Sequence, residues 1–162
     1  MPATLNTRCA PRSAAMLDEV LTPMHRDWAA CVARACAPAL LGTSTIWDRW
    51  SAVRYLNDAF QEHLGQEREL IRRLPRIDSQ TRERLAAVFE TLERLRARID
   101  SAGRRHHTGG LVTVLLKNLL EQLDAWCAAT EHVAGSIPLA LLPDQALDLL
   151  IEIQAHAPRH RG

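Results

Sequence analysis

Residues 44–74 constrain the fold more than any other stretch, because their pattern predicts a single helix of about eight turns that ends at Pro75. The inward-facing row of this helix has apolar side chains at seven-residue spacing, namely Ile46, Val53, Phe60 and Leu74. The remaining position of the row is Glu67, four residues after His63. A carboxylate at a core position requires a metal ion or hydrogen-bond donors, because burying an unpaired charge is costly.

Three other segments show apolar side chains at helical spacing between cap and loop residues. Helices are expected over residues 23–37, 78–101 and 111–133. Thr22 and Pro23 supply an N-cap and a first helical residue for the first of them. A short helix over residues 13–21 is therefore expected to be interrupted at Pro23.

A further amphipathic helix is expected over residues 146–154, with Leu147, Leu150 and Ile151 lying over one end of the molecule. Long helices joined by short loops pack as antiparallel neighbours. The sequence therefore predicts an all-α, up-down-up-down four-helix bundle with a short C-terminal fifth helix. All four tryptophans lie on or beside apolar stripes and are expected in the core: Trp28, Trp47, Trp50 and Trp126.

The chain has 162 residues, of which 47% are hydrophobic, and this suits one domain with a substantial core. We expect that domain over residues 13–155, a disordered tail over residues 1–12 and a flexible tail over residues 156–162. Twenty basic and 19 acidic residues leave a net charge of +1, which gives no global field for nucleic acid or an anionic membrane. No nucleic-acid or membrane partner is therefore expected.

The cysteines and the apolar runs indicate a cytoplasmic protein. Cys9, Cys31, Cys36 and Cys127 show neither a C-x-x-C pair nor the spacing of a disulfide framework, so free thiols are expected. No apolar run reaches the roughly 18 residues that span a bilayer, and the N-terminus lacks the apolar core of a secretory signal. The basic residues are almost all arginine, which we interpret as a bacterial coding bias.

Counting levels from the loops of an antiparallel bundle predicts which polar residues meet. His25 falls level with Phe60, within about one turn of His63. Glu67 falls level with the part of the fourth helix that contains Trp126. His25, His63, Glu67 and Trp126 are therefore predicted to converge.

The second helix contains Phe60, His63 and Glu67 in the pattern F-x-x-H-x-x-x-E, and Pro75 follows it. Together with His25 on the first helix, this pattern resembles the hemerythrin-like family of HHE cation-binding four-helix bundles. The resemblance implies that His25, His63 and Glu67 are ligands of a single divalent metal ion, with iron in first place and manganese or zinc as alternatives.

The second half of the chain departs from that family, in which the last two helices provide further histidines and a carboxylate. The third helix has no histidine, and Glu90 lies off its apolar seam. Trp126 and Thr130 stand at the expected ligand positions of the fourth helix, while Glu131 and His132 are expected to point away from its seam. The metal site that the resemblance implies is therefore incomplete.

Three interpretations of Glu67 follow. In the first, His25, His63 and the Trp126 indole satisfy a buried carboxylate without a metal ion. In the second, the same histidines and Glu67 bind a metal ion in a partial site. In the third, the helix phases are wrong and Glu67 lies at the surface.

The loop over residues 102–110, which contains His106 and His107, is the most concentrated basic patch of the chain. A solvated loop is favoured over a phosphate or nucleic-acid site, because no nearby aromatic residue offers a stacking platform. No serine or cysteine is placed beside a histidine and an orienting group, so nucleophilic catalysis has no support.

Two functions remain. The first is a non-catalytic bacterial regulatory or protein-interaction module with an incomplete metal site, whose partner is an unidentified protein; a homodimer is compatible with it. The alternative is a metal-binding sensor or storage protein that uses His25, His63 and Glu67 with iron, manganese or zinc. In neither case do we expect an enzyme.

Overall fold

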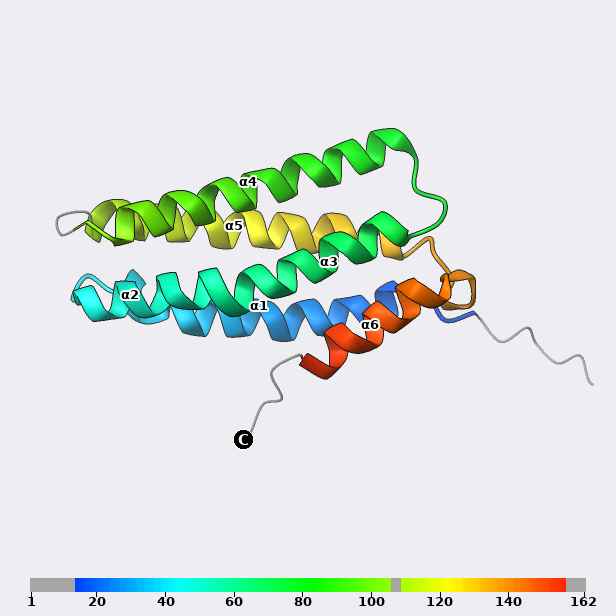
Figure 1. Ribbon diagram of the computed structural model, residues 1–162, viewed down its shortest axis with the longest axis horizontal. Coiled ribbons are helices and arrows are strands. Elements are labelled where there is room, and N and C mark those ends of the chain that lie inside the picture. Colours follow the sequence, from blue (N-terminus) through cyan, green and yellow to red (C-terminus); the bar gives the residue numbers. More distant parts are fainter. Residues whose placement is uncertain (1–13, 106–108, 157–162) are drawn as a thin grey trace, which may run out of the picture.

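The computed structural model describes residues 14–105 and 109–156, and these form an all-helical protein (Figure 1). The elements are α1 (Asp18–Leu40), α2 (Ile46–Tyr55), the π-helix η1 (Leu56–Phe60), α3 (Gln61–Arg73), α4 (Ser79–Gly103), α5 (Gly109–Ala134), the 3-10 helix η2 (Leu139–Leu141) and α6 (Asp144–His156). The prediction of an all-α protein is confirmed. Residues 1–13, 106–108 and 157–162 lie outside the described residues. They include Cys9, the predicted tail over residues 1–12, the His106-His107 pair and all of the predicted C-terminal tail except His156, which ends α6.

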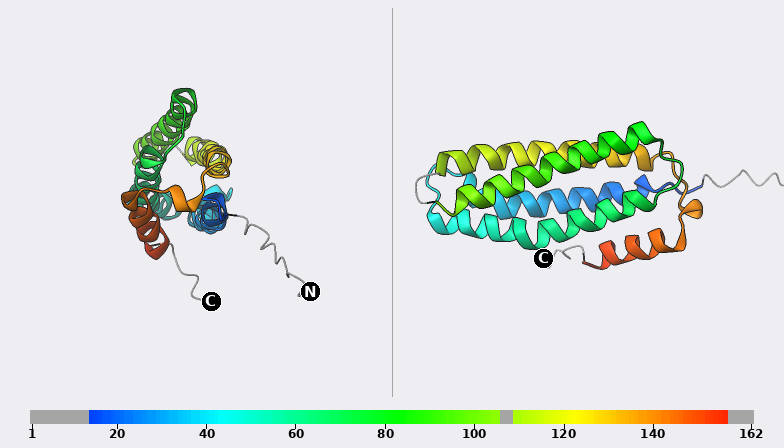
Figure 2. Two further views of the ribbon diagram at one scale, coloured as in Figure 1. Left: turned by 90° about the vertical axis from the view of Figure 1, so that its right-hand side faces the viewer. Right: turned by 45° about the horizontal axis from the view of Figure 1, so that its top comes forward.

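The long helices lie side by side, with α5 between α1 and α4 (Figures 1 and 2). Helix α5 packs extensively on both α4 and α1, and α2 packs on α1. Helix α6 packs against α3 on the outside of this group. The start of the described chain is tied to the segment after α5, because the Leu17 N–H donates to the Ile137 carbonyl over 2.9 Å.

The apolar stripe of the second predicted helix is largely buried in the structure. Val53, Phe60 and Leu74 lie in the core, and Ile46 is half-buried. Glu67 is only 2% exposed, so the prediction that a carboxylate occupies a core position is confirmed. The interpretation that placed Glu67 at the surface is wrong.

The prediction that Pro23 interrupts the first helix is wrong, because α1 runs without a break through both Pro23 and Pro38. Proline within a helix costs about 3 kcal/mol, whereas burying a leucine-sized side chain contributes about 1.5–3 kcal/mol. Leu17, Leu21 and Met24 are all buried around Pro23. Their combined burial outweighs the cost of the proline.

The second predicted helix is divided by the π-turn η1, and this turn overturns the prediction for two tryptophans. The extra residue in the turn shifts the helical phase before it by one position, so that Ala52 is fully buried beside the predicted core residue Val53. Trp47 is 76% exposed and Trp50 is 48% exposed, so the prediction that both lie in the core, made because they stand on or beside the apolar stripe, is wrong. Trp28 and Trp126 are buried as predicted.

The predicted contact face of the last helix is confirmed for Leu150 and wrong for Leu147 and Ile151. Ala146, Leu150 and Ile153 are the buried residues of α6, while Leu147 and Ile151 are exposed. The buried face differs because α6 lies along the side of α3, whereas the prediction placed this helix over one end of the molecule.

Two helix caps and the predicted free thiols are seen in the described residues. Thr45 caps α2 in a capping box with Asp48, and Asp78 caps α4 by accepting from the Thr81 N–H over 2.6 Å. Cys31, Cys36 and Cys127 are free thiols. Among the helices of residues 14–105 and 109–156, none combines the length and apolar content that a membrane span requires.

Two glycines provide a matched test of this packing. An added Cβ at Gly65, within α3, meets no atom within 4 Å, so Gly65→Ala should raise the free energy of unfolding by about 0.5–1 kcal/mol. An added Cβ at Gly103 would lie 2.6 Å from Val53 Cγ2, which is a steric clash. Gly103→Ala should therefore lower the free energy of unfolding. Urea unfolding of both variants measures these changes, and equal effects of the same sign would contradict this helix packing.

Candidate functional site

Glu67 lies at the centre of a polar cluster between α1, α3 and α5. Its Oε1 atom is 2.8 Å from His25 Nε2 of α1 and 3.0 Å from His63 Nε2, one turn earlier on α3. Its Oε2 atom accepts a 2.6 Å hydrogen bond from the Trp126 indole N–H of α5. The predicted convergence of His25, His63, Glu67 and Trp126 is therefore confirmed.

Trp126 closes the side of the cluster that faces α5. Its ring is fully buried and meets Phe89 edge to face, with ring centroids 5.9 Å apart. Thr130, at the expected position of a second carboxylate ligand, directs its hydroxyl to the carbonyls of Trp126 and Cys127 instead. At the positions where the family resemblance implies metal ligands, α5 thus has an indole N–H donor, from Trp126, and a threonine hydroxyl bonded to the backbone.

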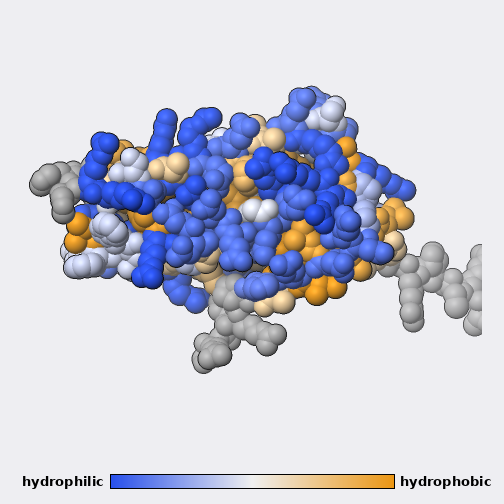
Figure 3. All heavy atoms as spheres, in the orientation of Figure 1, coloured by the Kyte–Doolittle hydropathy of each residue, from blue (hydrophilic) through white to orange (hydrophobic). Residues whose placement is uncertain are grey.

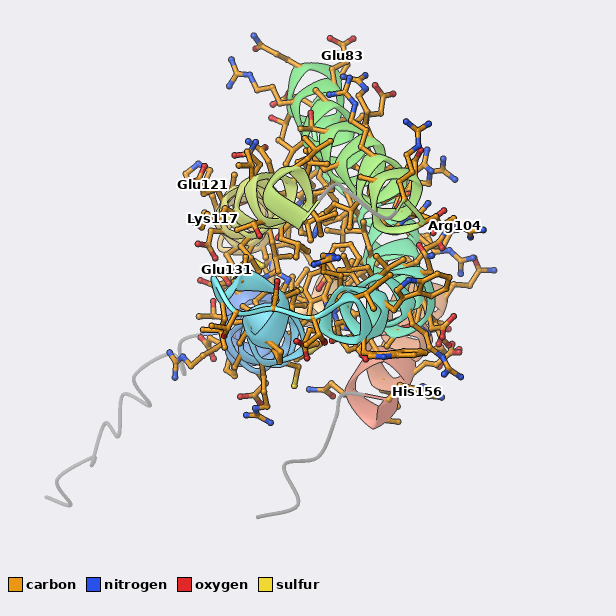
Figure 4. The ribbon with its side chains drawn as sticks, turned by 90° about the vertical axis from the view of Figure 1, so that its left-hand side faces the viewer. Glu83, Arg104, Lys117, Glu121, Glu131 and His156 are labelled. Carbon is orange, nitrogen blue, oxygen red and sulfur yellow. The ribbon has the colours of Figure 1, made fainter. Side chains whose placement is uncertain are left out.

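Glu131 joins the cluster, contrary to the prediction that it points away. Its Oε1 atom lies 2.8 Å from His25 Nδ1, and its side chain is 28% exposed. Figure 4 shows Glu131 where α5 meets α1. Helices α1 and α5 pack closely enough for a residue on the flank of α5 to reach His25. A helical wheel drawn for α5 alone could not show this contact.

His63 links the cluster to the surface. Its ring packs on Trp28 with centroids 4.1 Å apart, and Trp28 in turn stacks on Phe60. His63 also lines a cavity of about 420 Å³, together with Cys31 and Tyr55, where the C-terminal end of α6 approaches. The side chain of His63 is 11% exposed, so it is the histidine of the cluster that solvent reaches.

The cluster favours a charged His25 and a charged Glu67. Burial alone would lower the pKa of His25, but hydrogen bonds to Cys127 and Glu67 outweigh it and raise this pKa to about 11. Burial alone would raise the pKa of Glu67, but hydrogen bonds from His25 and His63 lower it to about 2. An imidazolium between the carboxylates of Glu67 and Glu131 is consistent with the two 2.8 Å contacts of the His25 ring.

The same atoms satisfy part of the requirement for a metal site. Two imidazole nitrogens and a carboxylate oxygen suit iron, manganese or zinc. His25 Nε2 is buried and meets Glu67 Oε1 at 2.8 Å outside ideal hydrogen-bond geometry, and Nδ1 contacts the Glu131 carboxylate, as is usual for metal-bound histidine. However, Trp126 engages the second oxygen of Glu67, and the described part of the chain has no cluster of three or more His, Cys, Asp or Glu residues arranged to hold a metal ion.

Comparisons with protein-family models, curated proteins and solved structures found no match. The resemblance to the hemerythrin-like family therefore stays a prediction from Phe60, His63, Glu67 and His25.

The charged pair predicts how stability depends on pH. Because the pKa of Glu67 falls from 4.5 to about 2 on folding, its contribution is complete above pH 4.5 and disappears as the pH drops toward 2. Because the pKa of His25 rises from 6.5 to about 11, its contribution is complete below pH 6.5 and disappears as the pH rises toward 11. The free energy of unfolding should therefore be highest between these limits.

Urea unfolding between pH 3 and pH 9 measures this profile. His25→Gln should flatten the alkaline side, whereas Glu69→Gln, a change at a partly exposed carboxylate on the same helix, should leave the profile intact. A wild-type stability that stays constant from pH 6.5, the unfolded pKa of His25, up to pH 9 would contradict a charged His25.

Proposed function

We propose that this protein is a non-catalytic regulatory or protein-interaction module, built as an up-down-up-down four-helix bundle with a short fifth helix. Its core resembles that of a hemerythrin-like domain whose cation site is closed by Trp126. The hydrogen bond from the Trp126 indole to Glu67 Oε2 carries this proposal, because an indole N–H cannot bind a metal ion.

The closed cluster supports a structural role for its residues. Both oxygens of Glu67 contact nitrogen atoms, and these come from α1, α3 and α5. His25 and Glu67 are each 2% exposed, so neither side chain can contact a substrate in solution. Buried polar groups that must be satisfied together favour one relative placement of the helices over others.

The interaction surface that we propose lies at the end where α2 and α5 begin. The elements that meet at this end carry four exposed apolar side chains, namely Leu41, Trp47, Trp50 and Leu111; we refer to these four as the Trp47 surface. Exposed apolar patches mark interaction sites, and tryptophan is among the residues that contribute most to protein interfaces. Such a patch at the end of a bundle supports docking of another protein.

The charges beside the Trp47 surface indicate the chemistry of that partner. Arg49 and Arg54 lie on α2 next to the two tryptophans, and neither forms an ion pair within the described residues. Arg104, which follows α4, extends outward at the same end of the molecule and forms a 3.1 Å ion pair with Asp100 (Figure 4). We therefore propose a protein partner with an apolar contact area and an acidic edge.

Metal binding is the second candidate function. It is favoured by the contact of His25 Nδ1 with Glu131, because this contact orients the ring. His25 Nε2 then faces Glu67 Oε1, and His63 Nε2 lies beside the same oxygen. His25, His63 and Glu67 would hold a divalent ion, and the ion would supply the Lewis-acid or redox chemistry typical of a sensor or storage protein.

Metal analysis distinguishes the two candidates. Protein purified without a histidine tag should contain no stoichiometric iron, manganese or zinc, and a chelator should leave its melting temperature unchanged. A stoichiometric metal ion that is lost in Glu67→Ala, but kept in the control Glu69→Ala, would overturn the non-catalytic interaction module in favour of a metal protein.

Site-specific cross-linking tests the Trp47 surface. A photoreactive residue at position 47 should capture a specific protein that the same residue at position 98, on exposed α4 surface, does not capture. The purified partner should then bind the wild-type chain, and Trp47→Ala should weaken binding about 30-fold or more, as loss of a central interface tryptophan does. Capture only of a second copy of this chain, or undiminished binding by Trp47→Ala, would contradict the proposed partner.

A further inference from the structure

Helices α3 and α4 diverge from one another along the molecule. Helix α4 follows α5 and contacts α2 and η1 near its C-terminal end, while α3 turns toward α6. Figures 1 and 2 show the two helices separating toward the loop that joins them, residues 74–78. The space between them is only partly filled by side chains.

A cavity of about 220 Å³ lies in this space, and we call it the inner cavity. Its apolar wall consists of Ile71, Leu85, Phe89 and Trp126, with Ala86 beside them. Three arginines complete the lining: Arg68, Arg72 and Arg82. None of the described residues that line it is acidic, so the inner cavity combines an apolar wall with an excess of positive charge. In Figure 3, apolar surface shows between strongly hydrophilic side chains in this region.

The three arginines differ in their availability. Arg82 is fixed, because its guanidinium donates to the carbonyls of Ile71 and Leu74 over 3.2 Å and 2.8 Å. Arg72 is largely exposed and lies 3.7 Å from Glu69. Arg68 lies over the Phe89 ring, 4.4 Å from its centroid, and forms no ion pair within the described residues. Arg68 is therefore the cation best placed to receive an anion.

The positive excess of the inner cavity does not extend into the hollow beside it. A larger hollow of about 650 Å³ adjoins it and shares Arg68 and Arg72, but Glu69, Glu90 and Glu93 also line that hollow. An anion is therefore attracted more strongly on the side of Arg68 that faces the inner cavity than on the side that faces this mixed outer hollow.

We propose that the inner cavity binds a medium-chain carboxylate, with its carboxylate on Arg68 and its hydrocarbon chain against Leu85, Phe89 and Trp126. Guanidinium and carboxylate form charge-assisted, paired hydrogen bonds, which gives this end of the site its specificity. The volume lies below the roughly 300 Å³ at which drug-sized pockets begin, so a short hydrocarbon chain fits better than a long-chain lipid.

The inner cavity shares one residue with the buried cluster. The ring of Trp126 lines the cavity, while its indole N–H donates to Glu67 Oε2. A bound hydrocarbon chain would therefore lie against Trp126, the residue that donates to Glu67. Ligand binding in the inner cavity would in this way affect the buried cluster. This ligand site goes beyond the proposed interaction function and does not require it.

Calorimetric titration with octanoate tests the inference, with octylamine as a probe of similar size and opposite charge. Octanoate should bind with saturation, and octylamine should not. Arg68→Gln should weaken octanoate binding about tenfold or more, as expected for loss of a hydrogen bond to a charged group. Arg98→Gln, an exposed change on α4 away from the cavity, should leave the affinity unchanged.

If Arg68→Gln folds poorly, the variant Ala86→Phe still tests whether octanoate binds in the inner cavity. Ala86 is exposed and lines the inner cavity, so Ala86→Phe should fill the cavity and abolish octanoate binding in a folded protein, as verified by circular dichroism. The inference is overturned if octanoate shows no saturable binding, if octylamine binds equally well, or if Arg68→Gln or Ala86→Phe binds octanoate like the wild type.

Discussion

The ionised carboxylate of Glu67 is the group on which the arrangement of the helices depends most. A buried charge without partners would cost more than a small domain can tolerate, since net stabilities are only about 5–15 kcal/mol. His25, His63 and Trp126 provide the partners, and they come from α1, α3 and α5. A slip of one residue along any of these helices rotates its side chains by about 100°. Such a slip would leave Glu67 unpaired, so the cluster disfavours alternative packings.

Trp126 connects this cluster to the ligand site that we propose. One edge of its indole donates to Glu67, and its ring forms part of the wall between α3 and α4. Where these helices diverge, the buried ring forms part of the wall of the inner cavity, whereas the tight packing of α5 on α1 holds Glu131 against His25. The two sides of α5 thus differ in packing. The side toward α1 is tightly packed, and the side toward α3 and α4 borders the inner cavity.

Much of the fold could be predicted because it follows from local rules. The apolar stripes and the loop residues between them predicted the helices. Counting levels between antiparallel neighbours predicted that His25, His63, Glu67 and Trp126 meet. The failures arise where tertiary packing decides. Burial on both sides of Pro23 keeps α1 continuous, and the π-turn η1 moves Trp50 away from the core. The contact of Glu131 with His25 depends on the approach of α1 to α5, which no single-helix pattern contains.

The protonation of His25 tests the central claim, that the cluster is an ion-paired network complete in itself, most directly. Nitrogen NMR of the ring in protein labelled with ¹⁵N-histidine distinguishes protonated from unprotonated nitrogens, and a His25→Gln sample assigns the signals. We predict that both ring nitrogens of His25 are protonated at pH 8, between its unfolded pKa of 6.5 and its folded pKa of about 11. An unprotonated Nε2 at this pH would contradict the account, because the Glu67 carboxylate would then lack its charged partner.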